Sequence, residues 1–145
     1  MVRAKSTLGG IPVGQAMLTD FRSLSPRDSL SRAAELIVTG SQQDFPVVDN
    51  GAVVGVLTRG DLLAALPRRG QAAPVGDVMR PDVQSVDYSE MLEDAFARLQ
   101  TGDFQTLPVI HGGQLVGLVT ADNVREFLMI RSALGAPSRR KVSYA

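Results

Sequence analysis

The feature that most constrains this chain is an internal repeat of 62 residues, the interval from Met17 to Met79. The pattern Val-Gly-x-x-Met of residues 13–17 returns in residues 75–79. The register holds without a gap across residues 13–66, and the equivalent pairs include Asp20 with Asp82, Pro46 with Pro108, Gly55 with Gly117 and Thr58 with Thr120. Self-similarity at a fixed period indicates two copies of one folding unit.

Both copies begin with the same predicted elements. A short extended piece, residues 21–24 or 83–86, precedes a helix whose apolar residues recur at helical spacing. Gly40 and Gly102 follow these helices, at the position where a left-handed C-terminal cap is expected.

Two apolar strands come next in each copy. Asn50–Gly51 joins them in the first copy and Gly112–Gly113 in the second, and such dipeptides favour two-residue hairpin turns. A second helix is expected after Thr58 and after Thr120. Each copy therefore has the predicted order β-α-β-β-α.

The repeat also sets the expected domain boundaries. A unit of about 55 residues has little core of its own. We therefore expect one module with a mixed α/β (α+β) fold, in which two β-α-β-β-α repeats pack around a pseudo-twofold axis. Residues 67–74 are polar and bounded by prolines, which is typical of a linker. The expected segments are an N-terminal tail 1–10, a first repeat 11–66, the linker 67–74, a second repeat 75–134 and a C-terminal tail 135–145.

Composition argues against several classes of function. Lys plus Arg and Asp plus Glu number 15 each, so the chain lacks the basic excess of a dedicated nucleic-acid binder. The absence of cysteine excludes a disulfide framework and fits a reducing compartment. No apolar run approaches the roughly 20 residues that span a bilayer, and residues 1–10 lack the apolar stretch of a signal peptide. The expected location is cytoplasmic.

The sequence offers little for catalysis or metal binding. His111 is the only histidine and lies beside a predicted turn. No second histidine or cysteine exists to complete a zinc site, and a Ser-His-Asp triad would need His111 buried beside a serine. We therefore expect a protein that is not an enzyme and that requires no cofactor or metal.

Three motifs in each copy resemble the tandem CBS (cystathionine-β-synthase) pair, also called a Bateman module. They are Val-x-x-x-Met at the start, Pro-Val in the first hairpin strand, and Gly-hydrophobic-hydrophobic-Thr in the second, found as Gly55–Thr58 and Gly117–Thr120. The resemblance covers residues 11–129. It implies a regulatory module that binds AMP, ADP, ATP or a related adenosyl ligand in clefts between its repeats and forms a homodimer through its helices.

The resemblance also implies site residues. In the family pattern Gly-h-h-Thr-x-x-Asp, the Thr faces phosphate and the Asp accepts from the ribose hydroxyls, and Thr58 and Asp61 match it fully. The second copy has Thr120, but Asn123 stands at the Asp position and Asp122 lies one residue earlier, a rotation of about 100° on a helix. The cleft with Thr58 and Asp61 is therefore expected to bind more tightly. A structural interpretation stays open, because threonine is an ordinary N-cap residue and a first-turn Asp favours the helix dipole.

Two alternatives accompany this interpretation. Residues 120–134 are similar to the end of bacterial site-2-type intramembrane zinc metalloproteases, which carry a CBS pair after their membrane core. The chain would then be their cytosolic portion, with a membrane connection only through a larger protein, or a free-standing paralogue. The other alternative is a ligand-free structural or dimerisation module, whose interface would use apolar residues of the second helices.

Overall fold

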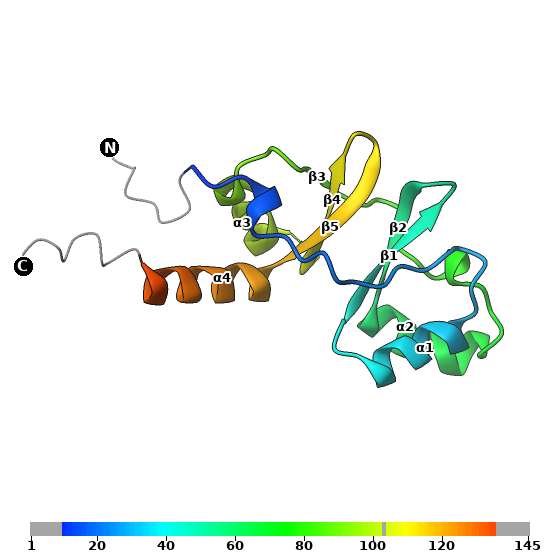
Figure 1. Ribbon diagram of the computed structural model, residues 1–145. Helices are drawn as coiled ribbons and strands as arrows, with labels where there is room; N and C mark the ends of the chain where they lie inside the picture. Colours follow the sequence, from blue (N-terminus) through cyan, green and yellow to red (C-terminus); the bar gives the residue numbers. More distant parts are fainter. Residues whose placement is uncertain (1–9, 103, 136–145) are drawn as a thin grey trace, which may run out of the picture.

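The computed structural model shown in Figure 1 describes residues 10–102 and 104–135. Of the expected tails 1–10 and 135–145, residues 1–9 and 136–145 lie outside the described residues. No helix in the described ranges is long and apolar enough to cross a membrane.

The expected order of elements is confirmed in the second copy and, in the first, from its first helix onward. The extended piece expected at residues 21–24 forms no strand and makes only an isolated bridge from Leu24 to Val47. The first repeat forms the elements α1 (Leu30–Thr39), β1 (Asp44–Asp49), β2 (Ala52–Thr58) and α2 (Arg59–Arg69). The second forms β3 (Val86–Asp87), α3 (Leu92–Thr101), β4 (Thr106–His111), β5 (Gln114–Thr120) and α4 (Ala121–Leu134). The short 3-10 turns η2 (Val13–Gln15) and η3 (Val75–Asp77) open the two copies. The fold is mixed α+β, as predicted.

The two halves lie side by side, with β1, β2, α1 and α2 on the right of Figure 1 and β3–β5, α3 and α4 on its left. Each hairpin is antiparallel, β1 with β2 and β4 with β5. Asn50 and Gly51 have φ of 52° and 82°, and Gly112 and Gly113 have φ of 61° and 81°. Positive φ at both central residues is the geometry that the two dipeptides predicted.

The predicted left-handed caps at Gly40 and Gly102 are wrong. Gly40 has φ of −143° and Gly102 of −96°, both with extended ψ, so each helix passes directly into the chain that leads to the next strand. A glycine still fits, because a Cβ on Gly102 would lie only 3.0 Å from the Arg98 carbonyl oxygen. The second helix of the first repeat also runs further than expected, since α2 includes Pro67 and ends at Arg69, inside the segment assigned to the linker.

The repeats exchange their first segments. Ile11, Val13 and Ala16 belong to the hydrophobic core of the second repeat, although the repeat boundaries place them in the first. Val75 correspondingly belongs to the core of the first repeat. A backbone hydrogen bond from Val13 N to Glu90 O, 2.8 Å long, holds the first of these segments on the second repeat. Each core is therefore completed by the other copy, which joins the repeats into one module.

The contacts between the repeats follow the pseudo-twofold relation. Leu18 forms an isolated bridge with Leu118, and Val56 forms the equivalent bridge with Arg80. The segments that begin each copy and pack on the other repeat, here called the crossing segments, contain Met17 and Met79. They pass directly over two strand glycines: a Cβ on Gly117 would lie 2.5 Å from the sulfur of Met17. A Cβ on Gly55 would lie 2.6 Å from the Met79 sulfur. The Met and Gly of the repeated motifs are thus partners across the interface.

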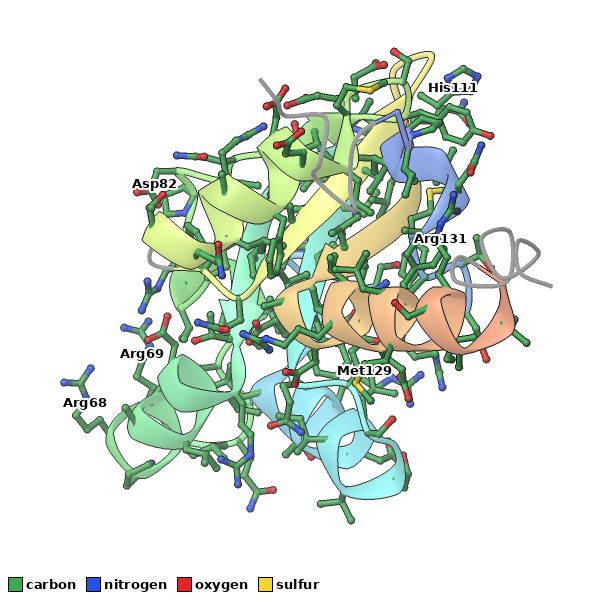
Figure 2. All side chains as sticks on the ribbon, turned by 90° about the vertical axis from the view of Figure 1, so that its left-hand side faces the viewer. Arg68, Arg69, Asp82, His111, Met129 and Arg131 are labelled. Atoms are coloured by element: carbon green, nitrogen blue, oxygen red, sulfur yellow. The ribbon has the colours of Figure 1, made fainter. Side chains whose placement is uncertain are left out.

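Helix α4 has 14 residues and extends beyond the two sheets (Figure 1). Met129, Ile130 and Leu134 on it are 69%, 53% and 78% exposed. Figure 2 shows Met129 and Arg131 along this helix and His111 at the tip of the β4–β5 hairpin. The ring of His111 lies 4.6 Å from that of Tyr88, and no group of His, Asp and Glu suited to a metal ion occurs among the described residues.

Candidate functional site

A cavity of about 620 Å³ lies where the two repeats meet. The first repeat supplies the crossing segment around Leu18 and Asp20, the loop that leads into β1, and the first turn of α2. The second supplies the residues before β4, Leu118 of β5, and the first turn of α4. The cavity is thus built from both repeats, and the N-termini of two helices border it.

Thr120 and Asn123 line this cavity and also cap α4. The Thr120 hydroxyl accepts from Asn123 N at 2.9 Å, and Asn123 Oδ1 accepts from Thr120 N at 2.6 Å, which is a reciprocal capping box. Asn123 Nδ2 donates to the carbonyl oxygen of Ala16 at 2.7 Å. Asn123 therefore ties α4 to the crossing segment, in addition to forming part of the cavity wall.

Asp122 lies at the cavity but turns outward, as its position one residue before Asn123 predicted. Its side chain is 97% exposed and accepts from Arg125 Nη1 at 2.9 Å. This carboxylate is therefore directed to solvent and to its own helix.

Thr58 and Asp61 do not line this cavity. The Thr58 hydroxyl accepts from Asp61 N at 3.1 Å and caps α2. The carboxylate of Asp61 accepts from Arg80 Nε at 2.7 Å, and the hydrogen bonds from Arg80 hold the pKa of Asp61 below its usual value. The Arg80 guanidinium also lies 5.4 Å from the centre of the Phe104 ring. The carboxylate that the resemblance implies as the ribose acceptor is thus already bound by a cation of the same chain.

The difference between the two clefts comes from residues outside the motif. Arg80 is the equivalent of Leu18, and Phe104 is the equivalent of Gln42. The Arg80 guanidinium therefore contacts both Asp61 and the Phe104 ring, whereas the equivalent residues Leu18 and Gln42 line the cavity together with Asn123. The motif alone did not reveal this, but the mismatch of Leu18 with Arg80 is visible in the aligned repeats.

Asp44 is the half-buried carboxylate of the cavity. Thr106 donates its hydroxyl to Asp44 Oδ2 at 3.1 Å, and the backbone amide of Arg59 also donates to this carboxylate. Burial raises the pKa of Asp44 above its usual value, against these hydrogen bonds and the charge of Arg80. No motif singled out Asp44, and its raised pKa depends on burial that only the packed repeats provide.

Known proteins share both the sequence pattern and the fold. A model of the CBS domain matches residues 13–68 and 75–130. The chain is 27% identical over 126 residues to the CBS domain-containing protein YhcV of Bacillus subtilis, covering 86% of this chain and 90% of YhcV. It is 29% identical to inosine-5'-monophosphate dehydrogenase of Thermoplasma acidophilum over 74% of its own length, but it spans only 22% of that enzyme.

Among solved structures, CBSX2 from Arabidopsis thaliana is 33% identical with a TM-score of 0.75, covering 85% of this chain and 98% of CBSX2. CBSX2 has also been solved in complex with AMP, and this structure gives a TM-score of 0.74. The cytosolic domain of the Mg²⁺ channel MgtE in complex with ATP is 25% identical with a TM-score of 0.70, covering 80% of this chain and 48% of that one.

Proposed function

Because this chain belongs to the CBS domain family, we propose that it is a non-catalytic regulatory module that binds one adenosyl ligand in the cavity between its repeats. The observation that carries the proposal is the cavity itself. Its volume of about 620 Å³ lies within the usual range for small-molecule sites, roughly 300–1,000 Å³. It combines apolar walls, Leu18 and Leu118, with polar groups such as Thr120, and a nucleoside needs both.

The relatives support an adenosyl ligand. CBSX2 binds AMP in a structure at 33% identity, and the MgtE cytosolic domain binds ATP. In this chain Leu18 and Leu118 would pack against the base. The hydroxyl groups of Thr120 and Thr106, with the carboxylates that line the cavity, would meet the ribose.

The structure favours a different order of the two clefts from the one expected from the motif. That expectation depended on Asp61 as a charged acceptor for ribose. Since Asp61 is paired with Arg80, a ligand there would have to displace a charge-assisted hydrogen bond of 2.7 Å. We therefore propose that the cleft of Thr120 and Asn123 binds first, with one ligand per chain.

Regulation would act through a second copy of the chain or an attached protein. The exposed apolar residues of α4, Met129, Ile130 and Leu134, suit a homodimer interface. Ligand that prefers one arrangement of the repeats would shift the population toward it. None of the relatives named above is a metalloprotease, so attachment to a site-2-type membrane protease stays a prediction from the resemblance of residues 120–134.

One observation favours the alternative of a ligand-free dimerisation module. Thr120 and Asn123 bind each other and Ala16, so these polar groups are satisfied without a ligand. Isothermal titration distinguishes a ligand-binding module from a ligand-free dimerisation module. A ligand-free module would form the dimer and release no heat with any nucleoside.

The test uses the asymmetry of the clefts. Isothermal titration with adenosine and AMP, and with guanosine as a specificity control, should show one site per chain for the adenine compounds. The double variant Leu18→Arg/Asn123→Asp transplants the Arg80–Asp61 pair into the open cleft, and we expect it to lose binding. The single variant Asp61→Asn, in the closed cleft, is the matched control and should bind as the wild type does. Equal binding by all three proteins would place the ligand elsewhere.

A further inference from the structure

The N-terminus of α2 already holds an anion of the chain itself. Helix N-termini are common phosphate sites, because their first amides are unpaired and the helix dipole favours negative charge. Here the Asp44 carboxylate accepts from the Arg59 amide at the start of α2 and from the Thr106 hydroxyl. A phosphate placed at this helix end would have to displace Asp44 or lie beside its charge.

The N-terminus of α4 is also occupied by groups of the chain. Ala121, the equivalent of Arg59, donates its amide to the carbonyl oxygen of Gln105 at 3.3 Å. The amide of Asn123 donates to the Thr120 hydroxyl at 2.9 Å. Two of the first-turn amides that would hold a phosphate are therefore engaged, and so this helix end is a weak anion site as well.

The side chains around the cavity carry excess negative charge. Its lining includes four carboxylates and one guanidinium, namely Asp20, Asp44, Asp122, Glu126 and Arg59. Arg125 offsets Asp122 through an ion pair at the rim. When Asp122 is left out because of this ion pair, the lining still has three carboxylates and one guanidinium. A 5′ group placed at the start of α2 would lie beside Asp44, the half-buried member of this set.

We propose that the cavity selects an adenosyl ligand whose 5′ group is neutral or cationic and that it discriminates against nucleoside polyphosphates. This proposal rests on the proposed function and names the ligand class of the same site. A cationic 5′ group gains from the carboxylates, and each phosphate added to a nucleoside brings negative charge toward them. The chemistry that fits is an adenosine bearing an amine, a sulfonium or an uncharged thioether at C5′.

The experiment compares probes that share the adenosine core and differ in charge at C5′. Isothermal titration at pH 7 uses 5′-amino-5′-deoxyadenosine, adenosine, AMP and ATP, without divalent cations, because a bound cation would screen the carboxylates. We expect affinity to fall in that order. The amine should bind at least about tenfold more tightly than ATP, since charges within a few ångströms commonly shift equilibria by that factor or more.

Charge-removal variants identify the cause. Asp44→Asn keeps the shape and should raise AMP affinity about fivefold or more while leaving adenosine affinity within about twofold. Asp20→Asn is the second variant, for use if Asp44→Asn does not fold. Glu93→Gln removes the same charge on the exposed face of α3, away from the cavity, and should leave the ratio of AMP to adenosine affinity unchanged.

The outcomes separate the two proposals. If no adenosine compound binds, the proposed function fails and the ligand class fails with it. If adenine compounds bind and ATP or AMP binds more tightly than adenosine, the proposed function stands and the charge selection is overturned. Asp44→Asn and Asp20→Asn proteins that both keep the wild-type ratio of affinities would also overturn it.

Discussion

Asp44 and Thr106 are equivalent residues of the two repeats, 62 positions apart, and the Thr106 hydroxyl donates to the Asp44 carboxylate at 3.1 Å. A residue that contacts its own equivalent lies beside the pseudo-twofold axis. One partner is an acid and the other an alcohol. The pseudo-twofold axis therefore relates the backbones of the two repeats but not their charged side chains. The two clefts on either side of it therefore differ in chemistry, although the motifs that define them are similar.

Replacing Arg80 by the residue at its equivalent position should open the second cleft. Arg80→Leu removes the cation that binds Asp61 at 2.7 Å and leaves a leucine like Leu18. We expect the number of adenosine sites per chain, measured by isothermal titration, to rise from one toward two. Arg69→Leu, at the exposed end of α2 (Figure 2), is the control and should keep one site. A single site in Arg80→Leu would show that Arg80 does not close the cleft.

Adding a methyl group at the crossing point should weaken the whole module. Gly117→Ala places a Cβ 2.5 Å from the Met17 sulfur and 2.9 Å from the Leu18 carbonyl oxygen. Overpacking of this kind costs about 1–3 kcal/mol of unfolding free energy, measured by urea denaturation. Gly60→Ala, where a Cβ meets nothing within 4 Å, should instead be neutral or slightly stabilising. Equal effects of the two substitutions would contradict the close approach.

The Asp61–Arg80 pair should make the free energy of unfolding depend on pH in the acidic range. The folded-state pKa of Asp61 lies below its ordinary value of 3.8, so the unfolded chain binds the proton more readily. Its contribution is then fully present above about pH 4 and is lost as pH falls through the lowered pKa. Asp61→Asn should cost up to about 1 kcal/mol at pH 7, since the pair is partly exposed.

The measurement for this pair is the unfolding free energy at pH 7 and at pH 3 or below. The difference between wild type and Asp61→Asn should shrink at the lower pH. Asp122→Asn removes a carboxylate that is 97% exposed, and we expect it to change stability little at either pH. If the difference in unfolding free energy between the wild type and Asp61→Asn grew as the pH fell, the ion pair could not be its cause.

Apolar residues of α4 should mediate self-association. Ile130 is 53% exposed beside Met129, and Ile130→Glu would place a charge within any interface there. We expect light scattering to give a dimer for the wild type and the chain mass of 15.5 kDa for the variant. Val38→Glu, on α1 at a position that is 82% exposed, is the control and should remain dimeric. A wild-type protein with the monomer mass at high concentration would refute the dimer.

The sequence alone determined those features that follow from local rules. The 62-residue register, the order α-β-β-α shared by both copies and the two hairpin turns were predictable, because turn φ angles and helical periodicity depend on neighbouring residues. The family and its mixed α+β fold followed from motifs present twice. The capping roles of Thr58 and Thr120 were also foreseeable, since an N-cap acts within its own first turn.

Only the tertiary structure decided how the copies complete each other and which cleft is open. Asn123 binds Ala16 across 107 positions, and Arg80 binds Asp61 across 19, so no local pattern reports either contact. The helix ends at Gly40 and Gly102 also differ from the local cap rule, since both glycines are extended where the chain continues toward the next strand. The charge of the cavity likewise comes from Asp20, Asp44 and Glu126, which lie on separate segments that converge only when the repeats pack.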